Sequence, residues 1–224
     1  MLKSPKVFGI GLQKTGTSSL GEALTLFGYT VCRANFAEQT LRKLGKELGP
    51  EHRDQSSCEL FFEKVILPLT KDYDAFQDVP WCFYYRELEK HFPDSRFILT
   101  LRDPQSWYRS MKSYDRTYNT TRAQRVLAWN YGEGNPIQNR ELYLERFREH
   151  TEGVLKFFHK RPQKLLVLRM EERDKMRKLA EFLGEPLPSR RYPHVNIGKK
   201  NRIMNRLDDV RNLVRRSKER LIQN

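Results

Sequence analysis

The chain has 224 residues, a length typical of one α/β domain or of two very small ones. Hydrophobic residues make up 38% of the sequence and aromatic residues 12%, which is enough for a packed core and excludes wholesale disorder. The 42 lysines and arginines exceed the 28 acidic residues, so the formal net charge is +14. This excess indicates an anionic partner, such as nucleic acid, a membrane surface or a phosphorylated or sulfated small molecule, although a solvated charged face would give the same count.

The sequence also indicates a compartment. No run of about 18 apolar residues occurs, and the amino terminus lacks the apolar region and cleavage site of a secretory signal. The three cysteines, Cys32, Cys58 and Cys82, are 26 and 24 residues apart and form no C-x-x-C pair. An odd, scattered set argues against a disulfide framework or a zinc site, so we expect a cytoplasmic protein.

Strand and helix patterns alternate along the chain. In order, we predict a strand at 6–11, a helix at 18–27, a strand at 29–33, helices at 37–48 and 57–69, a strand at 73–77, a helix at 80–92, a strand at 96–101, a helix at 104–111, an irregular segment at 113–138, a helix at 141–159, a strand at 164–169 and a helix at 174–183. Gly28 stands where the first helix needs a residue of positive φ. This alternation predicts the α/β class, with a doubly wound parallel sheet between two layers of helices.

The carboxy-terminal segment is the most basic part of the sequence. Residues 199–224 carry nine lysines and arginines and three acids, with apolar residues near helical spacing. Because no linker or repeat precedes it, we interpret the chain as a single domain, 1–224, with this segment as a helix that packs on it. A helix that binds nucleic acid or a membrane is the alternative.

A loop rich in glycine and hydroxyl groups lies between the first predicted strand and the first predicted helix. Residues 9–20 read G-I-G-L-Q-K-T-G-T-S-S-L. A strand, such a loop and a helix amino terminus together form a cradle for phosphate-like anions, because backbone N–H groups and the helix dipole face the ligand. The candidate binding residues are Lys14, Thr15, Gly16, Thr17, Ser18 and Ser19.

This cradle differs from the loop of nucleotide triphosphatases. There, lysine follows the last glycine in G-x-x-x-x-G-K-[ST], whereas Lys14 precedes Gly16 by two residues. The strongest predicted strand ends in Leu101-Arg102, so an arginine stands where a magnesium-binding aspartate is expected. Both departures argue against a Mg-ATP enzyme.

A second candidate anion site follows the strand at 96–101. Arg102 ends the strand, and Ser110 comes eight residues later, two turns into the next helix. A planar guanidinium with a nearby hydroxyl suits a second phosphate, while an arginine that merely ends a strand is the plainer interpretation.

Taken together, the two motifs resemble those of sulfotransferases that use 3′-phosphoadenylyl sulfate (PAPS). Those proteins carry K-[ST]-G-[TS]-x-[ST] after the first strand, as in residues 14–19, and R-x-P-x-x-x-x-x-S, as in residues 102–110. The likeness extends from about residue 6 to residue 200, since residues 165–184 resemble the family's closing strand–helix unit and residues 192–200 its basic return segment.

The resemblance implies a role for Asp78, which ends the strand at 73–77 and precedes Pro80 by two residues. Family members place a His or an acidic residue there as the base that accepts the acceptor's proton. Burial would raise the pKa of this carboxyl and help it to act near neutral pH. The alternative is that Asp78 only caps the helix predicted at 80–92.

The resemblance further implies in-line transfer of a sulfuryl group from PAPS to a hydroxyl, or an amine, of a small molecule or carbohydrate, with PAP as the product. Lys14 would meet the charge on the leaving oxygen, and Arg102, Ser110 and Lys199 or Lys200 would hold the 3′-phosphate. No metal is expected, because none of the five histidines is spaced as a ligand.

The resemblance leaves several points open. Residues 30–70 and 112–140 are expected to shape the acceptor pocket. A P-loop nucleotide or small-molecule kinase and a non-catalytic nucleotide- or RNA-binding protein are the rival interpretations, although nucleic acid is not the favoured partner. The oligomeric state does not follow from the sequence.

Overall fold

The computed structural model describes residues 2–33, 55–115 and 121–195. The chain forms two compact units, Met1–Tyr192 and Pro193–Asn224, and nearly all of the second lies outside the described residues. The helices predicted at 37–48 and 199–224 also lie outside them. The architecture below is therefore that of the first unit.

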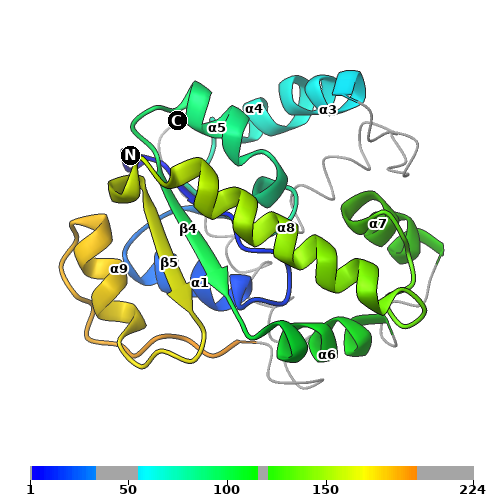
Figure 1. Ribbon diagram of the computed structural model, residues 1–224. Helices are drawn as coiled ribbons and strands as arrows, with labels where there is room; N and C mark the ends of the chain where they lie inside the picture. The colour runs from blue at the N-terminus through cyan, green and yellow to red at the C-terminus, as the bar shows by residue number, and fades with distance from the viewer. Residues whose placement is uncertain (1, 34–54, 116–120, 196–224) are drawn as a thin grey trace, which may run out of the picture. The chain divides into compact units, whose positions relative to one another are not determined.

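Five parallel strands form one sheet in the order β2-β3-β1-β4-β5, and Figure 1 labels the neighbours β4 and β5. The strands are β1 (Val7–Gly9), β2 (Val31–Cys32), β3 (Ala75–Gln77), β4 (Arg96–Leu101) and β5 (Leu165–Arg169). Each lies within or on its predicted range. Since β3 lies on one side of β1 and β4 on the other, the order in which successive strands are added reverses at β1, and its carboxyl end is the switch point where ligands bind in such sheets.

Helices connect the strands. They are α1 (Thr17–Leu26), α3 (Gln55–Phe61), α4 (Leu67–Leu69), α5 (Tyr85–His91), α6 (Pro104–Asp115), α7 (Thr121–Tyr131), α8 (Arg140–Phe158) and α9 (Lys175–Leu183), with a π-helical turn at Phe62–Ile66 and 3-10 turns at Trp81–Phe83 and Pro162–Lys164. Gly28, just beyond α1, has φ of 84°, as predicted. None of the helices in the described ranges is long and apolar enough to cross a bilayer.

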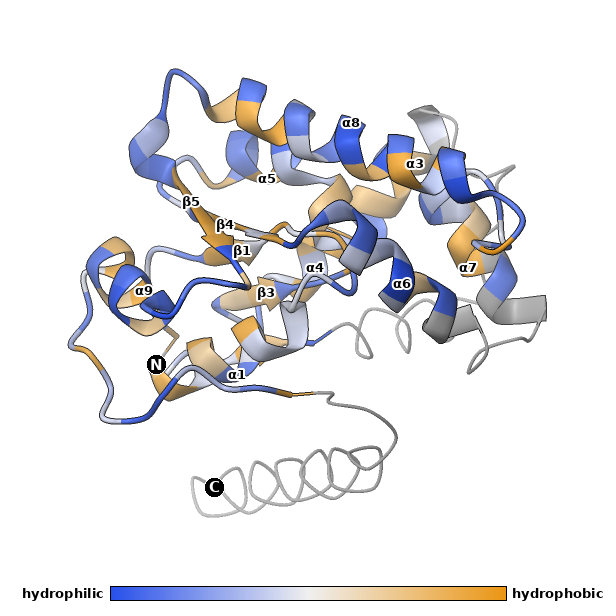
Figure 2. Ribbon diagram, turned by 60° about the horizontal axis from the view of Figure 1, so that its bottom comes forward, coloured by the Kyte–Doolittle hydropathy of each residue, from blue (hydrophilic) through white to orange (hydrophobic). Residues whose placement is uncertain are grey.

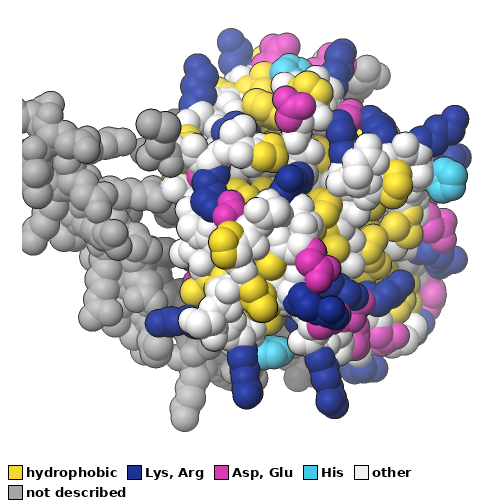
Figure 3. Space-filling model, turned by 90° about the vertical axis from the view of Figure 1, so that its left-hand side faces the viewer, with side chains coloured by type: hydrophobic (Ala, Val, Ile, Leu, Met, Phe, Trp, Pro, Cys, Tyr) yellow, Lys and Arg dark blue, Asp and Glu magenta, His cyan; other side chains and the backbone are white. Residues whose placement is uncertain are grey.

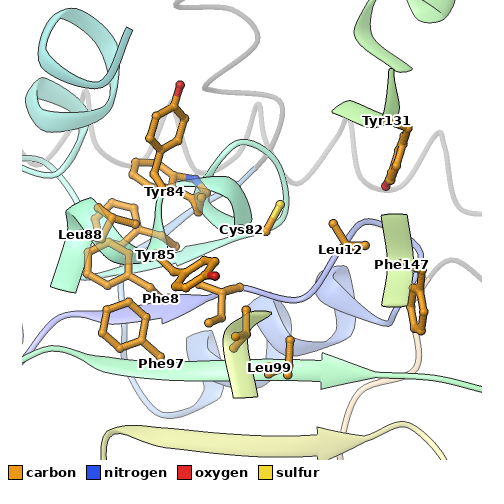
Figure 4. Packing of buried hydrophobic residues seen from close by; sticks show 14 of the residues in the cluster. Phe8, Leu12, Cys82, Tyr84, Tyr85, Leu88, Phe97, Leu99, Tyr131 and Phe147 are labelled. Atoms are coloured by element: carbon orange, nitrogen blue, oxygen red, sulfur yellow. The ribbon is translucent and has the colours of Figure 1, made fainter. Parts of the chain in front are cut away.

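The helices cover both faces of the sheet, which confirms the three-layer α/β prediction. Helices α1 and α9 lie on one side of the strands and α5 and α8 on the other (Figures 1 and 2). Alternate side chains of β1 supply the two cores, because Val7 packs with α1 and α9 whereas Phe8 packs with α5 and α8. Figure 4 shows Phe8, Tyr85, Leu88 and Phe97 gathered on the second face.

Two segments differ from the prediction. The helix expected at 80–92 is broken into the 3-10 turn Trp81–Phe83 and α5, because Tyr84 between them is not helical (φ −109°, ψ 21°). The segment expected to be irregular, 113–138, contains the end of α6 and the whole of α7. Long-range packing stabilises α7. The ring centroids of Trp129 and Phe83 are 5.7 Å apart, and those of the stacked rings of Tyr131 and Tyr143 are 4.7 Å apart.

Candidate active site

Three predicted site segments meet at one edge of the sheet. The last residue of β1, Gly9, is in register with Gln77 of β3 and with Ile98 of β4. Because parallel strands present their carboxyl ends at the same edge, the loop at 11–16, Asp78 after β3 and Arg102 after β4 all leave the sheet there.

The loop after β1 packs tightly on β4. A Cβ on Gly11 would lie 2.0 Å from Thr100 Oγ1 and 2.7 Å from Thr100 O, so only glycine fits. The Thr15 hydroxyl is 2.6 Å from Leu12 O and 2.7 Å from Thr100 Oγ1, and its side chain is fully buried. Thr15, a predicted nucleotide contact, therefore turns its hydroxyl into the protein, where it stabilises the curve of the loop.

The loop ends where α1 begins. Gly16 is the cap residue, with φ of 98°, and a Cβ there would lie 2.1 Å from the sulfur of Met170. Having no side chain, Gly16 offers the first-turn amides of α1 no acceptor of its own, which suits an anion at this terminus. Lys14 is half-buried in the left-handed region, with φ of 69°. Two glycines without room for a Cβ, and a helix start whose cap residue has no side chain, fit a phosphate-type ligand.

Asp78 faces the start of α1. The Thr17 hydroxyl donates to Asp78 Oδ2 at 2.6 Å, and the Val79 amide donates to Oδ1 at 2.8 Å. The carboxylate does not cap the 3-10 turn that follows, whose cap residue is Pro80. Like Lys14, Asp78 adopts positive φ, here 74°.

The pKa of Asp78 is raised above its ordinary value. Burial is the largest cause, and it outweighs the opposing effects of the Thr17 and Val79 hydrogen bonds and of the Lys14 charge. A half-buried carboxyl with a raised pKa, close to a lysine, can accept a proton from a bound hydroxyl more readily than an exposed aspartate.

The second predicted anion site lies along α6. Arg102 and Ser110 are both half-buried, and α6 is attached to the loop because Trp107 Nε1 donates to Gln13 O at 2.9 Å. The structure thus brings the start of α6 to the cradle. A common ligand for Arg102 and Ser110 stays a prediction, and Lys199 and Lys200 lie outside the described residues.

Other contacts of the site were missed by sequence reasoning. Met170 follows β5 and lies against Gly16, and Thr100 of β4 supports the loop. Neither residue type suggests a site, so no sequence signal could have found them. His150 was discounted among the histidines, yet its Nε2 lies 2.8 Å from Ile10 O, just before the loop.

The surroundings of the site are mixed in character. A groove of about 440 Å³ lies between the first turn of α6 and α8, with Gln105, Arg140 and Phe147 among its walls, and it includes none of the predicted site residues. On the face seen in Figure 3, basic and acidic side chains are interspersed rather than gathered into one basic stripe. Among the described residues, no three His, Cys, Asp or Glu side chains form a group that could hold a metal ion.

The chain is similar to known proteins. A family model described as a sulfotransferase domain matches residues 6–201. The Ava biosynthesis cluster protein M of Aspergillus versicolor is 28% identical over 212 residues, which span 85% of this chain and 80% of that protein. The crystal structure of a sulfotransferase from Alicyclobacillus acidocaldarius is 16% identical with a TM-score of 0.46, covering 89% of this chain and 88% of that one.

Proposed function

Because the chain belongs to the sulfotransferase domain family, whose reaction is sulfuryl transfer, we propose that it transfers this group from PAPS to a hydroxyl or an amine of a small molecule or carbohydrate. The observation that carries the proposal is the 2.6 Å hydrogen bond from Thr17 to Asp78. It joins the start of the predicted anion cradle to the predicted base, 61 residues away in sequence.

In this proposal, Asp78 accepts the proton of the attacking group. The raised pKa of its carboxyl makes the proton transfer more favourable near neutral pH than at an ordinary aspartate. The bonds from Thr17 and Val79 hold both carboxylate oxygens and thereby orient them. An oriented base at the edge of the cradle supports in-line attack, since attacking and leaving oxygens must lie on opposite sides of the transferred group.

The remaining residues bind and neutralise charge. When bound, PAPS supplies the activated sulfuryl group. Lys14 stabilises the negative charge that builds on the leaving oxygen, and the first-turn amides with the hydroxyls of Thr17, Ser18 and Ser19 hold the 5′ end. Arg102 and Ser110 hold the 3′-phosphate. The proposal assigns no role to a metal.

Thermal unfolding with added nucleotides tests the donor. A ligand at about 100 times its dissociation constant stabilises a protein by ~2.7 kcal/mol, which gives a clear rise in melting temperature. We expect this rise with PAP and little with AMP, which lacks the 3′-phosphate. Stabilisation by Mg-ATP alone would instead support the kinase, and the absence of any shift would contradict the proposal.

Substitution of the base tests the chemistry. Asp78→Asn should keep PAP binding but lose sulfate transfer from PAPS, because the amide cannot accept the proton. Asp103→Asn is the matched control: Asp103 lies at the same sheet edge but is exposed, and its carboxylate accepts from Ser106 N. Full transfer by Asp78→Asn would show that Asp78 is not the base.

A further inference from the structure

His150 joins α8 to the strand that leads into the cradle. Its Nε2 lies 2.8 Å from the carbonyl oxygen of Ile10, a residue 140 positions earlier. Ile10 directly follows β1, and its amide still donates to Ile98 O of β4, so it continues the pairing of the two strands. The loop begins at the next residue, Gly11. The imidazole therefore contacts the backbone at the base of the cradle.

The same ring contacts the segment that follows Asp78. It packs edge-on against the rings of Phe83 and Tyr85, with ring centroids 6.2 Å and 6.1 Å away. That segment is tied back to Asp78, whose carbonyl oxygen accepts from the Cys82 amide at 3.4 Å. His150 thus lies between the cradle and the chain that carries the proposed base.

The imidazole acts here as a neutral donor. Burial lowers the pKa of His150 to about 4 against the opposing effect of the Ile10 hydrogen bond, and the nearby Arg86 charge lowers it further. Since a carbonyl oxygen can only accept, Nε2 carries the proton at neutral pH. A neutral imidazole avoids the cost of burying a charge, and its single Nε2 donor is held by the Ile10 carbonyl oxygen.

We infer that His150 is a positioning residue that couples the cradle, through Ile10, to the Asp78 segment, through Phe83 and Tyr85. The part of this inference that concerns turnover rests on the proposed function. His150 touches no reacting atom in this scheme. Its effect is to keep the base and the bound donor in one geometry, where a displacement of about 1 Å can cost roughly a hundredfold in rate.

Two substitutions of His150 distinguish the effect of its N–H donor from the effect of its aromatic ring. His150→Phe keeps an aromatic ring without a donor, whereas His150→Gln keeps a donor that can reach Ile10 O. His159→Phe is the control, because His159 is exposed just after α8. We expect kcat for sulfate transfer to fall about 10- to 100-fold in His150→Phe, with KM for PAPS changed less than threefold, and to recover substantially in His150→Gln.

Amide hydrogen exchange tests the coupling without turnover. His150→Phe should speed exchange both at residues 10–17 and at residues 78–85, and His150→Gln should restore protection at both. Faster exchange in only one segment, or in neither, would overturn the inference, as would wild-type kcat in His150→Phe. A wild-type protein that neither binds PAP nor transfers sulfate would overturn the proposed function, while the exchange data would still decide the coupling.

Discussion

Gly16→Ala measures how tightly the start of α1 is packed against Met170, the residue that follows β5. The new Cβ would lie 2.1 Å from Met170 Sδ and 3.0 Å from its Cγ, at a residue with φ of 98°. The left-handed backbone costs about 1–2 kcal/mol for alanine, partly offset by the reduced entropy of the unfolded chain. Displacing a packed side chain costs about 1–3 kcal/mol more, so we expect the free energy of unfolding to fall by about 2–4 kcal/mol.

Gly28→Ala is the matched control. Gly28 also has positive φ, 84°, but the nearest atom to its new Cβ is the flexible Lys3 Cε at 3.5 Å. This variant bears only the backbone cost and should lose about 1 kcal/mol or less. The difference between the two variants isolates the clash with Met170.

Urea unfolding followed by circular dichroism gives both values. In a Met170→Ala background, the additional cost of Gly16→Ala should shrink to that of Gly28→Ala, because the clashing atoms are gone. Equal losses for Gly16→Ala and Gly28→Ala in the wild-type background, or an unchanged cost in the Met170→Ala background, would refute the reasoning.

Three further predictions concern charged groups and backbone strain. The pKa of His150, next to Arg86 and Tyr85, is about 4 in the folded protein rather than 6.5, so between these pH values the unfolded chain binds one more proton than the folded chain. The free energy of unfolding should therefore fall by about 3 kcal/mol as the pH drops from 6.5 to 4. In His150→Gln the acid slope in urea titrations should be shallower, and an unchanged slope would contradict this assignment. The folded pKa of Asp78 is raised, so the folded state binds the extra proton and loses stability as pH rises from 3.8 through that pKa. Asp78→Asn should therefore unfold at higher urea than wild type at pH 7 and at the same urea below pH 3.8; a less stable variant at pH 7 would be the opposite result. Finally, Lys14→Gly should be up to about 1 kcal/mol more stable than Lys14→Ala, since φ of 69° favours glycine, and the reverse order in the same assay would argue against a strained loop.

The two proposed catalytic side chains share a backbone feature. Lys14 and Asp78 are the non-glycine residues of positive φ in the described part of the chain. Such conformations cost of order 1–3 kcal/mol each and persist where surrounding contacts enforce them. Here the contacts of the loop with β4, and of Asp78 with Thr17, are those that hold the candidate site.

The local patterns of the sequence were sufficient for the sheet and for the cradle. β4 occupies its predicted range of 96–101, because five of its six residues are apolar or β-branched and leave few alternatives. The position of the loop between β1 and α1 was also predictable, because lysine, glycine and hydroxyl residues between a strand and a helix have a local physical meaning. The family resemblance added Asp78, to which local chemistry alone gave either a catalytic or a capping role.

Tertiary structure decided what depends on distant partners. Helix α7 forms in a segment predicted to be irregular, because Trp129 and Tyr131 pack against aromatic rings elsewhere in the chain. The bond from Thr17 to Asp78 spans 61 residues and that from His150 to Ile10 spans 140. The sequence by itself determined the strands, most of the helices and the position of the loop, since these depend on neighbouring residues. Only the fold determined which carboxylate and which histidine meet that loop, because these contacts exist only once the parallel strands have aligned their carboxyl ends.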